Sequence, residues 1–390
     1  MNQEISLSDN GGSLVKPALS FYTNMPTPYQ LDFFDALTEW FSLTVIYYSL
    51  KEHDRQWSLP ASSGSYKVVI LKDNLVARLV QKKVSSFHLA NNIKQVIAAD
   101  QSRYVVVNGT YWSPNVVLAI LHNYRRNKDV FFWTEPVFPV YNKTKRWLKR
   151  VFMWPVLNKT TALLAIGRAA EDSFRSFGYK KPVYQLPYNI NHKLFQKGNL
   201  DKEQLQTLHR KFKSQGEFIF LTSGSLIRRK GIDTLVKAFK KLDPSSKARL
   251  LIIGDGDERT SLDTLAKDCP GITFLGFQDK SMIPYWFNLA DAFVFASRYD
   301  GWGLIINEAI AASLPVICSR QTGAAVDKLS NGLAILLDSE DVEGFYEAMK
   351  DMMTGKLNRQ EIISRTNQIA EEFSSEYNAR QLYNICTAAE

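Results

Sequence analysis

Short apolar runs alternate with segments of helical periodicity along the chain, and this pattern occurs twice. Strands that are apolar on both faces are typical of parallel sheets covered by helices on both sides. The pattern therefore predicts an α/β chain built from two doubly wound, Rossmann-like halves. The expected strands of the first half are residues 17–23, 43–48, 67–71, 104–107, 130–133 and 162–166. Those of the second half are residues 218–221, 248–253, 272–275, 292–295, 316–318 and 334–337.

A polar and charged stretch, residues 196–216, separates the two series. We therefore expect one domain over residues 1–198 and a second over residues 199–374. The last segment, residues 375–390, contains an amphipathic helix that we expect to pack back on the first domain. Ligands of such folds bind at the carboxyl ends of the strands, and two facing halves enclose a cleft.

Composition narrows the class of protein. The 390 residues are 45% apolar, as in a globular protein, and no apolar run reaches the ~18 residues of a membrane-spanning helix. The amino-terminal segment lacks the basic and apolar regions of a signal peptide, so we expect a cytoplasmic protein.

The formal charge of +9 indicates an acidic partner, which would be nucleic acid, an anionic membrane surface or a phosphorylated substrate. No helix-turn-helix, RNA-recognition or zinc-binding pattern accompanies the charge, which argues against nucleic acid.

Two acids near residue 300 form the most informative motif. Asp300 and Glu308 are eight positions apart, slightly more than two helical turns, with a Gly-Trp-Gly turn between them. If a helix begins near Gly303, both carboxylates face the same way beside a helix amino-terminus, which attracts anions. Such a site suits a nucleotide sugar. The alternative is an ordinary acid-capped crossover helix.

A basic, glycine-flanked loop at residues 224–231 follows a predicted strand and precedes a predicted helix. Gly224 and Gly231 permit close backbone approach, and three cations lie between them: Arg228, Arg229 and Lys230. Charge that develops on a diphosphate leaving group needs fixed donors, so we expect this loop to bind phosphate. The alternative is a solvated basic turn.

A second glycine turn contains Gly254, Asp255, Gly256 and Asp257. Because no further carboxylate or histidine accompanies the two acids, we expect a tight turn that lines the nucleotide and no metal site.

The segment from residue 136 to residue 170 contains no acid. Aromatic and aliphatic residues are interleaved with its cations, so a helix here would have a basic face and an aromatic face. One interpretation is contact with an anionic membrane surface, and the other is a core-packing helix whose cations face water. The cations expected to contact the membrane are Lys143, Lys145, Arg146, Lys149 and Arg150.

Taken as an ordered set, these motifs resemble the retaining glycosyltransferases of family 4, bacterial group 1 enzymes of polysaccharide and lipopolysaccharide synthesis that have the GT-B fold. The resemblance covers about residues 162–385. The segments that carry it are residues 165–170, 186–191, 224–233, 252–256, 274–276 and 300–308.

The resemblance implies transfer of a sugar from a nucleotide diphosphate sugar to a hydroxyl of a glycan or lipid-linked acceptor. It implies retention at the anomeric carbon and no metal or other cofactor. The first domain would bind the acceptor and the second the donor. Alternatives within the fold are a sugar phosphorylase, a nucleotide-sugar epimerase and an inactive scaffold subunit.

Site roles follow from the resemblance position by position. Lys230 and Arg229 would hold the diphosphate, Asp300 the donor sugar and Glu308 the ribose. Glu135 stands where many members have a histidine, and it becomes the candidate polar group beneath the reacting carbon. The alternative is an acid on the domain surface. The remaining residues expected to contact the donor are Gly224, Ser225, Gly254, Gly256, Gly301, Trp302, Gly303 and Leu304. Two departures concern the donor pocket: Asp300 replaces the usual glutamate, and Ser225 replaces a frequent arginine.

Overall fold

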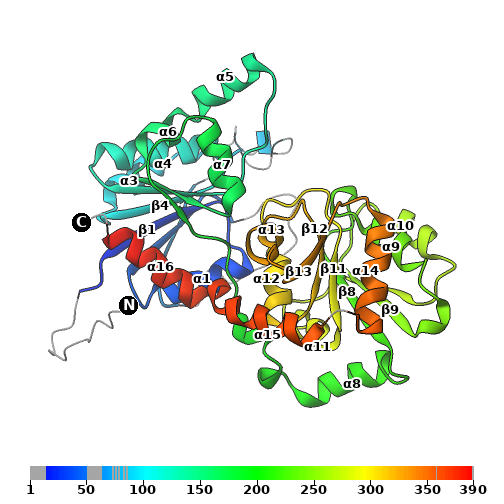
Figure 1. Cartoon of the computed structure of the whole chain (residues 1–390). Coiled ribbons are helices and arrows are strands. Elements are labelled where there is room, and N and C mark those ends of the chain that lie inside the picture. The colour runs from blue at the N-terminus through cyan, green and yellow to red at the C-terminus, as the bar shows by residue number, and fades with distance from the viewer. Residues whose placement is uncertain are drawn as a thin grey trace.

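The fold was obtained as a computed structural model, and its description covers residues 15–50, 64–72, 74, 77, 80–81, 84, 87–356 and 358–388. It contains two parallel sheets, one in each half of the chain (Figure 1). The seven-stranded amino-terminal sheet has the order β3-β2-β1-β4-β5-β6-β7, and the six-stranded carboxyl-terminal sheet has the order β10-β9-β8-β11-β12-β13. In both orders the first strand is central and the chain winds outward to either side. This is the doubly wound arrangement that the sequence predicts, and it confirms the fold class.

The strand bounds agree closely with the apolar runs. In the first sheet the strands are β1 (Ala18–Thr23), β2 (Ser42–Tyr47), β3 (Lys67–Ile70), β4 (Tyr104–Asn108), β5 (Asp129–Thr134), β6 (Ala162–Ala165) and β7 (Val183–Gln185). In the second they are β8 (Phe218–Ser223), β9 (Ala248–Ile253), β10 (Ile272–Gly276), β11 (Ala292–Phe295), β12 (Val316–Ser319) and β13 (Ala334–Leu337). Only β7 was not expected from the pattern.

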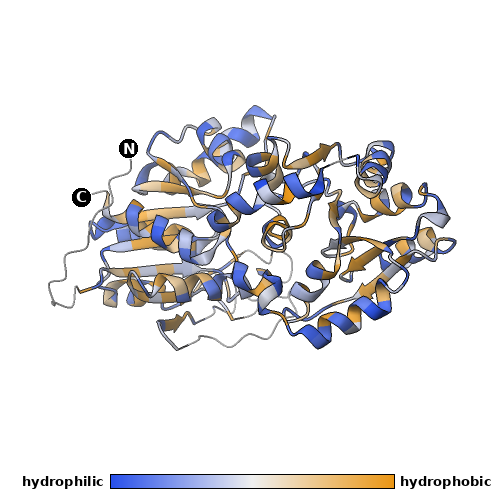
Figure 2. Ribbon diagram, turned by 60° about the horizontal axis from the view of Figure 1, so that its bottom comes forward, coloured by the Kyte–Doolittle hydropathy of each residue, from blue (hydrophilic) through white to orange (hydrophobic). Residues whose placement is uncertain are grey.

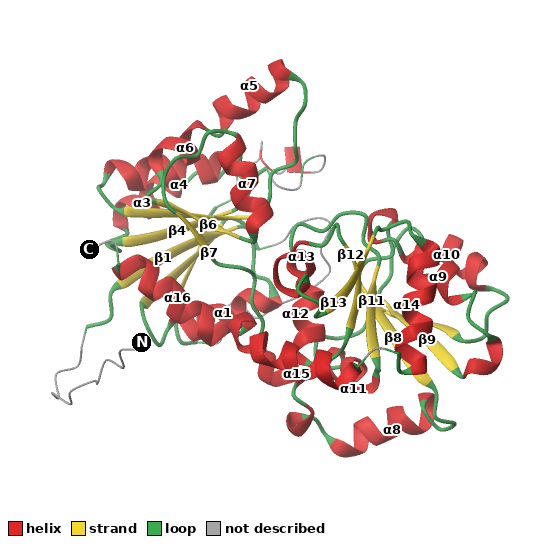
Figure 3. Ribbon diagram, viewed as in Figure 1, coloured by secondary structure: helices red, strands yellow, loops and turns green. Residues whose placement is uncertain are grey.

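Helices cover both faces of each sheet (Figure 3). The amino-terminal helices are α1 (Pro28–Leu37), α3 (Ile93–Ala99), α4 (Pro114–Arg125), α5 (Lys143–Phe152), α6 (Trp154–Lys159) and α7 (Arg168–Ser176). The carboxyl-terminal helices are α8 (Lys202–Phe212), α9 (Ile232–Phe239), α10 (Arg259–Ala266), α11 (Ile283–Leu289), α12 (Leu304–Ala311), α13 (Gly323–Leu329), α14 (Val342–Thr354), α15 (Arg359–Ile369) and α16 (Ser375–Thr387).

Three apolar clusters hold these layers together. One lies on the α3–α4 side of the first sheet and another on the α9–α14 side of the second. The third is continuous across the two domains, from Phe21 and Trp133 in the first to Trp302 and Ile306 in the second. Figure 2 shows the hydrophobic strands inside their polar and amphipathic helices. Because this buried cluster includes residues of both domains, the two domains are in apolar contact in this structure.

The chain returns to the first domain at its carboxyl end. Helix α16 lies along α1, and the ring of Tyr383 contacts Trp40 and Phe41 at centroid distances of 5.0 and 5.5 Å (Figure 1). Ser374 also forms a parallel bridge with Ile190. The exact domain boundaries at residues 198 and 374 stay a proposal.

Candidate active site

The basic loop of the second domain rests on backbone contacts that only glycine permits. Gly231 has φ +66°, and a Cβ there would lie 1.9 Å from the carbonyl oxygen of Ala296. Gly254 has φ +124°, and its Cβ would lie 2.0 Å from the oxygen of Gly224. A Cβ on Gly256 would meet the oxygen of Leu226 at 2.6 Å. The second glycine turn therefore packs directly against the backbone of the basic loop at Gly224 and Leu226.

The side chains of Lys230 and Arg229 and the backbone carbonyl of Arg228 have different partners. The Nζ of Lys230 is 2.5 Å from Oδ2 of Asp300, and each of these side chains is 16% exposed. Nη1 of Arg229 donates to the oxygen of Tyr299 at 2.6 Å and is 3.9 Å from the Asp300 carboxylate. The Arg228 carbonyl accepts a hydrogen bond from Nη1 of Arg298 at 2.6 Å. Lys230 is thus the cation that lies directly against Asp300.

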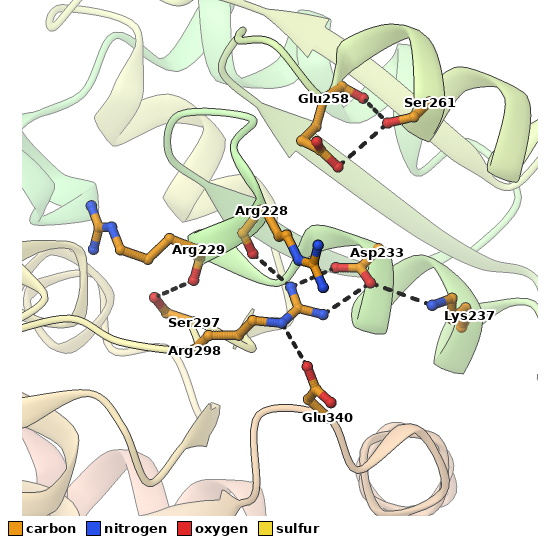
Figure 4. A network of polar contacts seen from close by, with 9 residues as sticks. All are labelled: Arg228, Arg229, Asp233, Lys237, Glu258, Ser261, Ser297, Arg298 and Glu340. Atoms are coloured by element: carbon orange, nitrogen blue, oxygen red, sulfur yellow. Dashed lines mark hydrogen bonds and ion pairs between the residues drawn. The ribbon is translucent and has the colours of Figure 1, made fainter.

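A second ionic network fixes the backbone of this loop (Figure 4). Arg298 binds both oxygens of Asp233 at 2.9 and 3.0 Å and also Glu340 at 2.8 Å, while Ser297 donates to the oxygen of Arg229 at 3.1 Å. Burial alone would raise the pKa of Asp233, but the bonds to Arg298 and Lys237 outweigh it and lower that pKa. Sequence reasoning missed this network because its members are separated by up to about 110 positions and fit no local motif.

The Gly-Trp-Gly turn brings the second domain against the first. A Cβ on Gly301 would lie 3.0 Å from Oε2 of Glu135, so the Glu135 carboxylate lies directly across the domain interface. Trp302 is buried against Gly167 and donates from Nε1 to Asn307 at 3.2 Å. Gly303, at φ +82°, precedes α12, which begins at Leu304 as the motif predicts.

The basic loop, the Gly-Trp-Gly turn with the start of α12, and Glu135 line a cavity of about 260 Å³ between the domains. Its lining contains seven of the residues expected at the site: Glu135, Gly224, Lys230, Asp300, Trp302, Gly303 and Leu304. It also contains four that sequence reasoning missed, which are Tyr29, Tyr188, Ser223 and Ile305. The expected residues that do not line it are Ser225, Arg229, Gly254, Gly256, Gly301 and Glu308. Gly301 and Arg229 lie beside it, and the two glycines of the second turn lie behind the loop.

Glu308 lies one turn inside α12. Burial raises its pKa to about 7, and the positive charge of Lys280 only partly offsets that effect. Lys280 itself bridges to the first domain, since its Nζ donates to Oδ2 of Asp32 at 2.9 Å and to the oxygen of Pro28 at 3.1 Å. Glu308 is therefore a carboxylic acid near the domain interface whose pKa lies close to neutral pH.

Comparison with known proteins identifies related sequences and folds. Residues 189–369 match the family model "Glycosyl transferases group 1". The chain is 36% identical over 137 residues to an alpha-monoglucosyldiacylglycerol synthase of Acholeplasma laidlawii, a match that covers 34% of each protein. It is 28% identical over 162 residues to the lipopolysaccharide core biosynthesis glycosyltransferase LpsE of Rhizobium meliloti, covering 40% of this chain and 46% of that protein. The matched stretches thus span between a third and a half of these relatives.

Solved structures share the fold over nearly the whole chain. Anabaena HepE, solved in complex with UDP-glucose, superposes with a TM-score of 0.72 at 14% identity, covering 95% of this chain and 99% of that one. WaaG, a glycosyltransferase involved in lipopolysaccharide biosynthesis, gives a TM-score of 0.66 at 14% identity, covering 95% and 99%. Residues 189–369 thus match the group 1 glycosyltransferases, also called family 4, and the chain as a whole has the GT-B fold.

Proposed function

We propose that this protein is a retaining glycosyltransferase that moves a sugar from a nucleotide diphosphate sugar to a hydroxyl of a glycan or lipid-linked acceptor, without a metal, in the synthesis of cell-envelope glycans. The observation that carries the proposal is the convergence of three features in one cavity. These are the Lys230–Asp300 pair, the amino-terminus of α12 at Gly303 and Leu304, and Glu135 from the opposite domain.

The cavity residues suit the charge changes of such a transfer. The leaving diphosphate gains negative charge, which the Lys230 ammonium and the backbone N–H groups at the start of α12 would stabilise. Asp300 would accept hydrogen bonds from the donor sugar while it orients Lys230. In a retaining transfer of this type the leaving oxygen takes the proton of the acceptor hydroxyl on the same face. The protein then supplies position and charge, and Glu135 would orient that hydroxyl.

The relatives indicate which donors to test. The Mycobacterium tuberculosis relative is named a GDP-mannose-dependent mannosyltransferase, and HepE was solved with UDP-glucose. A ligand that binds only the folded protein raises its melting temperature. We therefore expect one of the UDP-, GDP-, ADP- or TDP-sugars to raise the melting temperature and to be consumed when an acceptor is added. Release of sugar 1-phosphate with inorganic phosphate would indicate a phosphorylase instead, and turnover without an acceptor would indicate an epimerase.

Donor binding is expected to depend on pH through Glu308. In the free protein this carboxyl, with a pKa of about 7, is largely protonated below that pH. Ribose hydroxyls donate hydrogen bonds and so favour the carboxylate, which means that binding below neutral pH releases a proton. Affinity for the nucleotide sugar, whose doubly esterified diphosphate has no proton to lose in this range, should therefore rise from about pH 5.5 to about pH 7.5 and then level off.

Titration calorimetry across this range checks the expectation, with Glu308→Gln as the comparison. The amide cannot ionise, so the variant should bind more weakly and with little dependence on pH. If the variant retained the full pH dependence, Glu308 would not be the titrating group at the donor site.

The structure also favours one of the two interpretations of the basic segment. No residue of α5 is buried, and its apolar side chains face solvent: Trp147 is 65% exposed, Phe152 53% and Val151 48%. The helix projects from the amino-terminal domain (Figure 1). Among the residues described, no helix has the length and apolar character to span a membrane.

We infer that α5 lies flat on an anionic membrane, with its aromatic residues in the interface and its cations near the lipid phosphates. This would place the enzyme at the cytoplasmic face of a membrane that carries a lipid-linked acceptor. Arg146 and Lys149 also attach the helix to its own domain, because they donate to the oxygens of Ser176 and Phe138 at 2.6 and 2.7 Å. Lys143 and Lys145 have no such bond to the body among the described residues and would contact lipid.

A further inference from the structure

The cavity between the domains has two chemically different walls. The carboxyl-terminal wall offers charge and backbone donors through Lys230, Asp300 and Gly303. The amino-terminal side offers two aromatic rings, Tyr29 and Tyr188, together with the Glu135 carboxylate. No role in the transfer proposed above requires the two rings, so their position calls for a separate explanation.

Buried structure holds the Tyr188 ring in place. It packs edge-on against Trp133, a buried residue of β5, at a centroid distance of 5.2 Å. Trp133 is fixed in turn by a hydrogen bond from its Nε1 to the oxygen of Leu186 at 2.7 Å. The Tyr188 carbonyl accepts a hydrogen bond from Asn307 of α12 at 2.7 Å. Tyr188 is therefore tied to both domains.

Tyr29 lies next in this row of rings, 5.3 Å from Tyr188 and in an edge-on arrangement. It belongs to the first turn of α1, which begins at Pro28. That turn is bound to the second domain by Lys280, which contacts both the Pro28 carbonyl and the Asp32 carboxylate. Tyr29 and Tyr188, with Trp133 buried behind them, thus present a preorganised aromatic surface to the cavity. Preorganised contacts add affinity at little entropic cost.

An aromatic surface beside a carboxylate matches one class of acceptor. The C–H face of a pyranose is apolar and packs on an aromatic ring, while its hydroxyls project from the rim toward hydrogen-bond acceptors. The hydroxymethyl end of an acylglycerol has no such face. The donor sugar and its phosphates are already assigned to the opposite wall.

We propose that Tyr29, backed by Tyr188, is the platform of the acceptor subsite, and that the acceptor unit which receives the sugar is itself a sugar ring. The ring lies against Tyr29 and turns its reacting hydroxyl toward Glu135. This inference rests on the proposed transfer activity and specifies its acceptor class. Tyr29 is a specificity-determining residue in this scheme, since it contacts the acceptor and takes no part in proton or group transfer.

The test is steady-state release of the nucleoside diphosphate from the donor found by the melting screen. Octyl glycosides of glucose, galactose and mannose are compared with dioctanoylglycerol as acceptors. We expect an octyl glycoside to stimulate release far more than dioctanoylglycerol. In Tyr29→Ala and Tyr29→Leu the KM for that glycoside should rise about tenfold, with the donor KM changed less than about twofold. Tyr29→Phe, which keeps the ring, should behave like the unmodified protein.

Tyr124→Ala, at a half-exposed tyrosine of α4 outside the cavity, is the matched control and should leave both KM values unchanged. The proposal is overturned if dioctanoylglycerol is the better acceptor, if the donor KM rises as much as the acceptor KM, or if Tyr29→Phe is as impaired as Tyr29→Ala. A donor that binds but is not turned over with any acceptor would count against glycosyl transfer itself. Melting temperatures of the variants separate these outcomes from a failure to fold.

Discussion

Replacing Lys230 with alanine is expected to lower the rate of donor turnover by about 10²- to 10³-fold, the usual effect of removing one donor that stabilises transition-state charge. Two effects act together. The substitution removes the cation nearest to the diphosphate, and it leaves the Asp300 carboxylate without the ammonium that lies 2.5 Å from it. The unpaired Asp300 carboxylate would repel the leaving diphosphate, whose negative charge increases in the transition state. Turnover is measured as release of the nucleoside diphosphate.

The matched control for this variant is Lys241→Ala. Lys241 follows α9 at the end away from the basic loop, and both members of its ion pair with Glu343 are exposed. The control removes the same charge from the same domain and should retain nearly full activity. Both variants should melt close to the unmodified protein, because partly exposed ion pairs contribute little to stability. Equal activity in Lys230→Ala and the unmodified protein would reject the assignment of Lys230 to the diphosphate.

Removal of the outward-facing residues of α5 is expected to weaken binding to anionic vesicles by about 100-fold or more. Each basic residue near such a surface contributes about 1 kcal/mol, and burial of a large aromatic side chain contributes about 2 kcal/mol. The variant combines Lys143→Gln, Lys145→Gln and Trp147→Ser. These three side chains are exposed, so the fold should be unchanged. Cosedimentation with vesicles of phosphatidylcholine and phosphatidylglycerol measures the change.

The control for membrane binding is a protein with Lys202→Gln and Arg210→Gln, two exposed cations of α8 in the other domain. It loses the same charge but keeps α5, so it should bind vesicles as the unmodified protein does. Vesicles of phosphatidylcholine alone should bind all three proteins weakly. Equal loss of binding in the control and in the α5 variant would show that net charge, and not α5, is responsible.

The fold could be predicted from the sequence because the strands inside each sheet are buried on both faces and therefore appear as unbroken apolar runs. Strand β7 could not be predicted in this way. It has only three residues, lies at the edge of its sheet and exposes Tyr184 and Gln185. Its position depends on pairing with β6 and not on any pattern of its own.

The carboxyl-terminal wall of the site was accessible to sequence reasoning because its residues are contiguous, in the loop around Lys230 and in the turn around Gly303. The rings of Tyr29 and Tyr188 were not, since they come from segments about 160 positions apart that meet only when the first domain folds and packs on the second. The glycines at 254 and 256 were expected to contact the nucleotide. They support residues 224–226 from behind, and contact with the nucleotide stays a prediction for them.

The most direct test of the account is a crystal structure of the protein with the nucleoside diphosphate that gives the largest rise in melting temperature. We expect the diphosphate in the cavity between the domains, with one oxygen within hydrogen-bonding distance of the Lys230 Nζ and others at the backbone nitrogens of Gly303 and Leu304. We expect the ribose beside Glu308. A nucleotide bound elsewhere, or a diphosphate held without Lys230 and the start of α12, would contradict this expectation.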